Sequence, residues 1–137
     1  MPGFAYLDAS ALVKLAVLEP ETPALERELI DREALFSSAV AVTELMRAAR
    51  RTNRPGLLQQ VDTVLDSVFL ADVTAAICEQ AGRLDPPPLR ALDALHIATA
   101  VSLSLPGLDF ITYDDRQVGA AEAVGLRVRQ PGRGATL

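Results

Sequence analysis

FAYLDASALVKLA, residues 4–16, joins a short apolar run to a helical segment through one acidic residue, Asp8. Residues 4–7 are predicted to form a buried strand. Ser10 is predicted to cap the helix that follows, in which apolar residues recur at helical spacing. A strand followed directly by a helix is the building unit of α/β folds with a parallel sheet.

The same alternation continues along the rest of the chain. Further strands are predicted at residues 34–37, 68–70, 109–112 and 126–128. Helices are predicted at residues 22–30, 38–51, 57–65, 75–82, 90–103 and 114–124. Short links between alternating elements favour one α/β domain with right-handed crossovers. We assign residues 1–130 to this domain and residues 131–137 to a flexible tail.

Composition narrows the possible functions. Half of the 137 residues are apolar, which is enough for one packed core. A single cysteine excludes an internal disulfide framework, and no signal-peptide pattern or membrane-length apolar run is present, so we expect a cytoplasmic protein. The net charge of −5 argues against binding to nucleic acid, unless a cluster of carboxylates holds a divalent metal and inverts the local potential.

Four acidic residues stand where α/β proteins bind their ligands, near the carboxyl ends of strands. Asp8 and Asp114 directly follow predicted strands, whereas Glu44 and Asp93 lie in apolar helical sequence without an obvious Lys or Arg partner on the inward side. Burying an unpaired charge is costly, and a bound cation would offset that cost. Oxygen ligands without His or Cys clusters favour Mg²⁺ or Mn²⁺, which support phosphodiester hydrolysis. The alternative for Asp8 and Asp114 is an ordinary helix cap.

Four segments in this order and spacing resemble the PIN-domain nucleases, and among them the VapC toxins of toxin–antitoxin pairs: YLDASALVKL, SSAVAVTELMRA, ALDALHIATA and FITYDDR. The resemblance spans residues 4 to about 128. It implies a three-layer α/β/α sandwich with a central parallel sheet in the order 3-2-1-4-5. It also implies an endoribonuclease that uses Mg²⁺ or Mn²⁺.

The resemblance also carries residue roles and partners over to this chain. The acidic quartet would be Asp8, Glu44, Asp93 and Asp114. Ser10 and Thr112 match hydroxyl positions that orient a carboxylate or phosphate, and Asp115 would be a helper. The implied partners are an RNA substrate, a cognate antitoxin that blocks the active-site groove, and a second copy of the chain in a homodimer.

Basic and aromatic residues near the four acids allow two interpretations. Arg47, Arg50, Arg51 and Arg54 would line one face of a helix, either as a contact for RNA phosphates or antitoxin or as a solvated helix end. Lys14 and Arg116 could likewise reach the site or stay at the surface. His96 could act as a base, but metal-activated water needs none, so we favour a structural role. Packing is favoured for the remaining candidates, Tyr6, Cys78 and Tyr113.

Four other functions fit parts of the pattern. A receiver domain or a haloacid-dehalogenase-like phosphatase also places an Asp after a strand. The phosphatase needs a second Asp two residues later, where this chain has Ser10, and the acid pair Asp114–Asp115 comes too late for a receiver. A non-catalytic binding module, or a housekeeping RNA-processing nuclease without an antitoxin, remains open.

Overall fold

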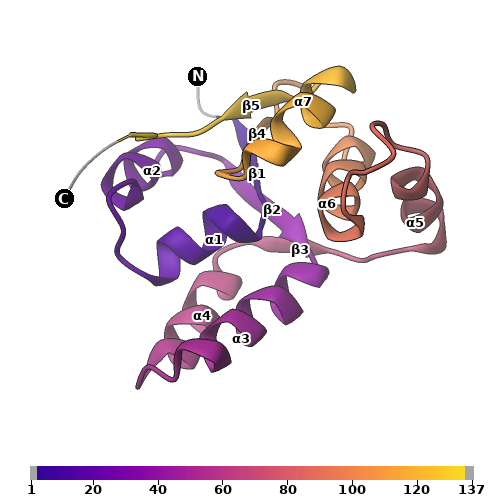
Figure 1. The fold of residues 1–137 in the computed structure, drawn as a ribbon. Helices are drawn as coiled ribbons and strands as arrows, with labels where there is room; N and C mark the ends of the chain where they lie inside the picture. The colour runs from indigo at the N-terminus through magenta and orange to yellow at the C-terminus, as the bar shows by residue number, and fades with distance from the viewer. Residues whose placement is uncertain (1–2, 135–137) are drawn as a thin grey trace.

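A five-stranded sheet forms the centre of the molecule in the computed structural model, which describes residues 3–134 (Figure 1). The strands are β1 (Phe4–Leu7), β2 (Ala34–Ser38), β3 (Phe69–Ala71), β4 (Asp109–Ile111) and β5 (Arg127–Arg129). They are hydrogen-bonded in the order β3-β2-β1-β4-β5, and every neighbouring pair is parallel. This confirms the predicted fold class and strand order.

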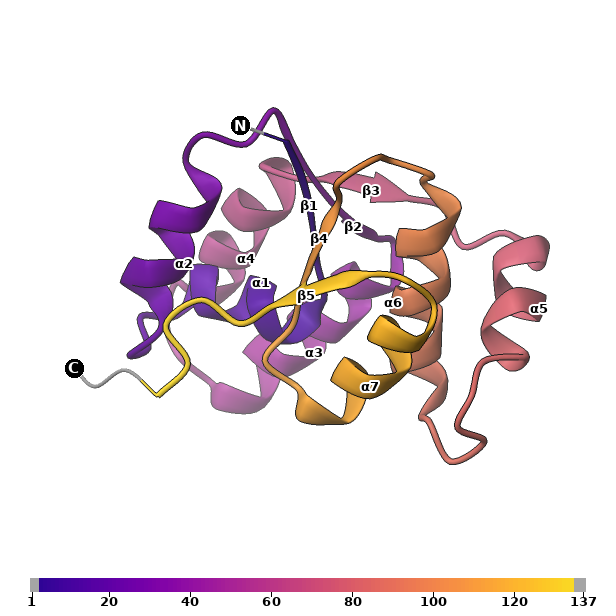
Figure 2. The ribbon, with the colours of Figure 1, turned by 90° about the horizontal axis from the view of Figure 1, so that it is seen from above.

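Helices cover both faces of the sheet. One group comprises α1 (Ala9–Ala16), α2 (Thr22–Leu29), α3 (Val40–Thr52) and α4 (Leu57–Asp66). The other comprises α5 (Ala75–Gly82), α6 (Ala91–Ser102) and α7 (Asp115–Ala123). Seen from above, α2, α1 and α4 lie to one side of the strands, and α6 and α5 lie to the other (Figure 2). The molecule is thus the predicted three-layer sandwich.

The alternation of side chains along β1 divides the core between the two layers. Ala5 and Leu7 pack with Leu12 and Leu25 from the first group of helices. Tyr6 points the opposite way and packs with buried residues of β4, α6 and α7. Because both faces of β1 are covered, residues that follow this central strand emerge into a buried environment. This is why an acidic residue directly after β1 is held inside the protein.

Several helix starts differ from the prediction by one or two residues, and α3 begins at Val40 instead of residue 38. Asp8, and not Ser10, is the N-cap of α1, and its side chain accepts a hydrogen bond from the backbone N–H of Ala11. Asp114 precedes α7 as its N-cap and accepts from the backbone N–H of Arg116. The cap interpretation is therefore correct for both acids, but each also has oxygen atoms engaged elsewhere.

The chain after β5 is held against the body as far as the structure describes it. The Tyr113 hydroxyl donates to the carbonyl of Pro131, and Arg133 donates to the carbonyl of Tyr113. Residues 131–134 of the predicted flexible tail therefore pack on the domain, and residues 135–137 lie outside the described residues. No helix within residues 3–134 has both the length and the apolar character needed to cross a membrane.

Candidate active site

Asp8 is buried to 1% exposure and accepts four hydrogen bonds from neutral donors. The Ser10 hydroxyl and the Ala11 N–H donate to Oδ1 at 2.6 and 3.0 Å. The Thr112 hydroxyl and the Gln117 amide donate to Oδ2 at 2.6 and 2.7 Å. Burial raises the pKa of Asp8, and these bonds oppose the rise only in part. The two hydroxyls thus orient a carboxylate, as the resemblance implied for them.

Gln117 links Asp8 to Asp93. Its Nε2 donates to Asp8 and, at 3.1 Å, to Oδ1 of Asp93, although the two acids are far apart in the sequence. Two oxygens that share one donor lie within two hydrogen-bond lengths of each other. The amide oxygen of Gln117 is buried and has no hydrogen-bond partner. Gln117 therefore brings the two carboxylates side by side at the carboxyl end of the sheet.

Arg90 links Asp93 to Asp114. Its Nε donates to Asp93 at 2.9 Å and its Nη2 donates to Asp114 at 2.8 Å. Arg116 also donates to Asp114, and that hydrogen bond together with the charge of Arg90 lowers the pKa of the Asp114 carboxyl. The three aspartates thus form one chain, from Asp8 through Gln117 to Asp93 and through Arg90 to Asp114.

Glu44 reaches the same region from α3 but shares no donor with the aspartates. Its Oε1 lies 2.7 Å from Nε2 of His96, which is buried to 1% exposure. The other ring nitrogen of His96 lies 2.7 Å from the Tyr6 hydroxyl. A positive charge on His96 would lower the pKa of Asp8, so the ring lies near that acid. Glu44 is therefore connected to the site through a buried histidine.

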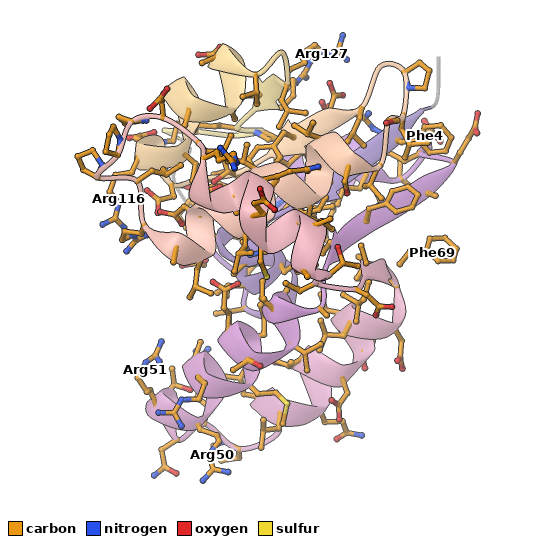
Figure 3. All side chains as sticks on the ribbon, turned by 90° about the vertical axis from the view of Figure 1, so that its right-hand side faces the viewer. Phe4, Arg50, Arg51, Phe69, Arg116 and Arg127 are labelled. Atoms are coloured by element: carbon orange, nitrogen blue, oxygen red, sulfur yellow. The ribbon has the colours of Figure 1, made fainter. Side chains whose placement is uncertain are left out.

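A groove of about 580 Å³ opens beside Glu44. It is lined by Ala9, Ser10, Val13, Val40, Thr43, Glu44, Arg47, Ala48, Arg51 and Leu92. Arg50 and Arg54 line a different hollow, and Arg54 lies beyond the end of α3. α3 ends at Thr52, so the predicted face of four arginines does not extend to Arg54 on this helix. Figure 3 shows Arg51 and Arg116 on the same side of the molecule, opposite Phe4.

Two other candidates point away from the aspartates. Asp115 is exposed and pairs with Arg133 at 2.7 Å, so it does not join the cluster. Lys14 pairs with Glu19 and Glu21 and lies over the ring of Tyr113. Neither side chain contacts the four central acids in this structure.

The donor set suits a small, hard cation. Carboxylate oxygens are the ligands that Mg²⁺ and Mn²⁺ prefer, and the buried Asp8 has no cationic side chain in contact with it. Within residues 3–134, no three acidic, histidine or cysteine side chains are close enough, as they stand, to surround one ion. N–H groups of Arg90 and Gln117 lie between the carboxylates instead. Arg90 is 54% exposed, so solvent leaves it room to turn away.

Sequence reasoning missed Gln117 and Arg90. The expectation that Asp93 has no basic partner at helical spacing is wrong, because Arg90 lies three residues before it and pairs with it. The sequence pattern could have identified Gln117, because it lies on the buried face of α7 together with Ala120 and Ala121. A polar residue in such a row needs buried partners.

The family model for the PIN domain matches residues 5–123. That range includes every strand but β5 and all four acids. The chain belongs to the PIN domain family, which confirms the resemblance drawn from the sequence.

Curated relatives and solved structures agree with this assignment. Ribonuclease VapC46 of Mycobacterium tuberculosis is 44% identical over 92% of this chain and 96% of its own length. Ribonuclease VapC35 of the same species is 41% identical over 93% of this chain and 97% of its own length. The crystal structure of M. tuberculosis VapC20, a toxin that cleaves the sarcin–ricin loop, superposes with a TM-score of 0.70 at 19% identity and covers 93% of this chain and 97% of its own. The crystal structure of VapBC2 from Rickettsia felis, bound to a fragment of its promoter DNA, superposes with a TM-score of 0.71 at 13% identity. The match covers 92% of this chain and 97% of that chain.

Proposed function

We propose that this protein is a metal-dependent endoribonuclease that acts as the toxin of a toxin–antitoxin pair, with Mg²⁺ as its metal and Mn²⁺ as a substitute. One observation carries the proposal: Asp8, Asp93 and Asp114 come from separate segments, yet Gln117 and Arg90 link them side by side at one end of the sheet. Relatives named as ribonucleases, more than 40% identical over nearly the whole chain, support the same activity.

The three aspartates would hold the metal together with Glu44, the fourth member of the acidic quartet. The metal, once bound, activates the attacking water and neutralises charge on the leaving oxygen. Ser10 and Thr112 keep the buried carboxylate of Asp8 in one orientation, and the Gln117 amide would have to leave Oδ2 for the metal to bind there. Arg90 would leave its two aspartates for an RNA phosphate, a ligand that its planar guanidinium binds in bidentate fashion.

The groove beside Glu44 supports the partner proposals. Its walls are mainly small apolar residues, while Arg47 and Arg51 add positive charge. A cognate antitoxin segment with apolar and acidic residues would fit this lining, and so would the backbone of an RNA strand approaching the acids. We also propose a homodimer in solution, which light scattering on the purified chain would measure.

Cleavage assays on purified protein test the enzymatic proposal. Asp8→Asn and Asp93→Asn should each lower RNA cleavage by at least roughly 100-fold, a loss expected when a preorganised charged group leaves the reaction centre. Asp62→Asn, the same change at an exposed position of α4, is the matched control and should keep full activity. Excess EDTA should abolish cleavage and added Mg²⁺ should restore it. Full activity in either site variant, or in EDTA, would contradict the proposal.

A further inference from the structure

Tyr6, His96 and Glu44 form a hydrogen-bonded chain from the core to the edge of the site. The Tyr6 hydroxyl lies 2.7 Å from Nδ1 of His96, and Nε2 lies 2.7 Å from Oε1 of Glu44. Tyr6 and His96 are buried to 0 and 1% exposure, whereas the side chain of Glu44 is 22% exposed. The chain thus anchors in the core and ends on the acid that lines the groove.

Packing fixes the first two members of this chain. The Tyr6 ring stacks on Phe110 with 5.4 Å between centroids, and the His96 ring meets Tyr6 edge-on at 5.8 Å. His96 lies one turn after Asp93 on α6, so the same helix carries a proposed metal ligand and the group that contacts Glu44. Any turn of the imidazole would break both hydrogen bonds inside a packed core.

The available donors and acceptors allow one neutral arrangement. A carboxylate only accepts, so Nε2 must carry the hydrogen that it donates to Glu44. Nδ1 of the neutral ring is then an acceptor, and the Tyr6 hydroxyl must donate to it.

We infer that His96 is a positioning residue, held by Tyr6 in its Nε2–H tautomer so that it aims the Glu44 carboxylate at the metal site. For a neutral ring the tautomer follows from the two hydrogen bonds, whereas the effect on metal binding rests on the proposed function. Replacing a group that hydrogen-bonds to a metal ligand typically lowers metal affinity or activity by roughly 10–100-fold.

The first test is NMR spectroscopy of the metal-free protein, and it does not depend on activity. His96 is the only histidine, so ¹⁵N-histidine labelling of protein made without a polyhistidine tag gives one pair of ring-nitrogen signals. We expect a hydrogen-bearing Nε2 and a bare Nδ1. Tyr6→Phe should weaken this preference, because it removes the donor to Nδ1. Tyr113→Phe, the same change at the other tyrosine, should leave the signals unchanged.

An Nδ1–H tautomer or a doubly protonated ring in the wild-type protein would overturn the inference. So would signals that do not respond to Tyr6→Phe, because the hydroxyl would then not be the donor. These outcomes are independent of whether the protein cleaves RNA. A protein with the expected tautomer but no metal binding would instead contradict the proposed function.

The second test compares two substitutions of His96 by Mg²⁺ calorimetry and by RNA cleavage. His96→Leu keeps the volume but removes the donor, and should weaken Mg²⁺ binding and cleavage by about 10–100-fold. His96→Gln places an amide N–H near the position of Nε2 and should recover most of the loss. Equal loss in both variants, or no loss in His96→Leu, would refute a positioning role. If His96→Leu does not fold, Glu44→Gln with the labelled histidine still reports the contact, since the His96 signals should shift.

Discussion

Asp8 and Asp109 are equally buried, at 1 and 0% exposure, but the protein surrounds them differently. Asp109 opens β4 and pairs in register with Ala5 of β1, while Asp8 follows Leu7 beyond the other end of the same strand. Asp109 contacts two arginines: Arg32 lies 2.6 Å from its Oδ2, and Arg127 binds Oδ1. Asp8 contacts only hydroxyl, amide and backbone donors.

The pKa values of the two carboxyls follow these surroundings. Burial acts to raise the pKa of Asp109, but the hydrogen bonds and charges of Arg127 and Arg32 outweigh it and lower the pKa. Burial dominates at Asp8 and its pKa rises. The fold thus compensates the charge of Asp109 with two arginines at the amino end of the sheet, whereas Asp8 at the carboxyl end is bound by neutral donors. This difference separates an acid retained for stability from one available to a cation.

The largest effect on stability is expected at Asp109. Asp109→Asn removes the buried counter-ion of Arg32, whose side chain is 12% exposed, and leaves only the half-buried Glu28, at 3.3 Å, as a counter-ion. We expect the free energy of unfolding in urea to fall by about 3 kcal/mol, the lower part of the range for breaking a buried pair. The lower part applies because Arg127 is 66% exposed and regains water. A loss below about 1 kcal/mol would remove the distinction between the two aspartates.

Low pH should remove the difference in stability between the wild-type protein and Asp109→Asn. The folded-state pKa of Asp109 lies below its ordinary value of 3.8, so its contribution is fully present above that pH and is lost as pH falls through the folded pKa. The stability gap should therefore be constant from about pH 7 to pH 5 and narrow below about pH 4. Urea unfolding at several pH values measures it. A gap that widens in acid would show that Asp109 does not act through its charge.

The sequence predicted the fold well because its signals are local and agree with one another. Each strand lies within about one residue of its expected position, and the apolar run at residues 4–7 already predicted a buried strand. Helix caps were less predictable. Ser10 and Asp8 are both good cap residues, and only the backbone angles of Asp8 determine which one is used.

The candidate site was predictable in its acids but not in the groups between them. Asp8 and Asp114 could be placed by rule, because acids after parallel strands gather at one edge. The links that Gln117 and Arg90 make between elements, and the partners of His96, depend on side-chain directions that residue spacing does not encode. His96 was expected to be structural, and its contacts with Tyr6 and Glu44 become visible only once α6 packs against the sheet.

The smallest effect on stability is expected at Asp8, when it is replaced by Asn in the same way as Asp109. Asp8→Asn in metal-free protein removes a charge that burial disfavours, which stabilises the fold, but it also replaces an acceptor of four hydrogen bonds by an amide that accepts fewer. The Thr112 hydroxyl can rotate to accept, and the unpartnered amide oxygen of Gln117 can accept after a flip, so most of the loss is recoverable. These effects oppose each other, and the free energy of unfolding should change by less than about 1 kcal/mol. A loss as large as that of Asp109→Asn would mean that Asp8 is held for stability, and the carboxyl end of the sheet would then be no more specialised than the amino end.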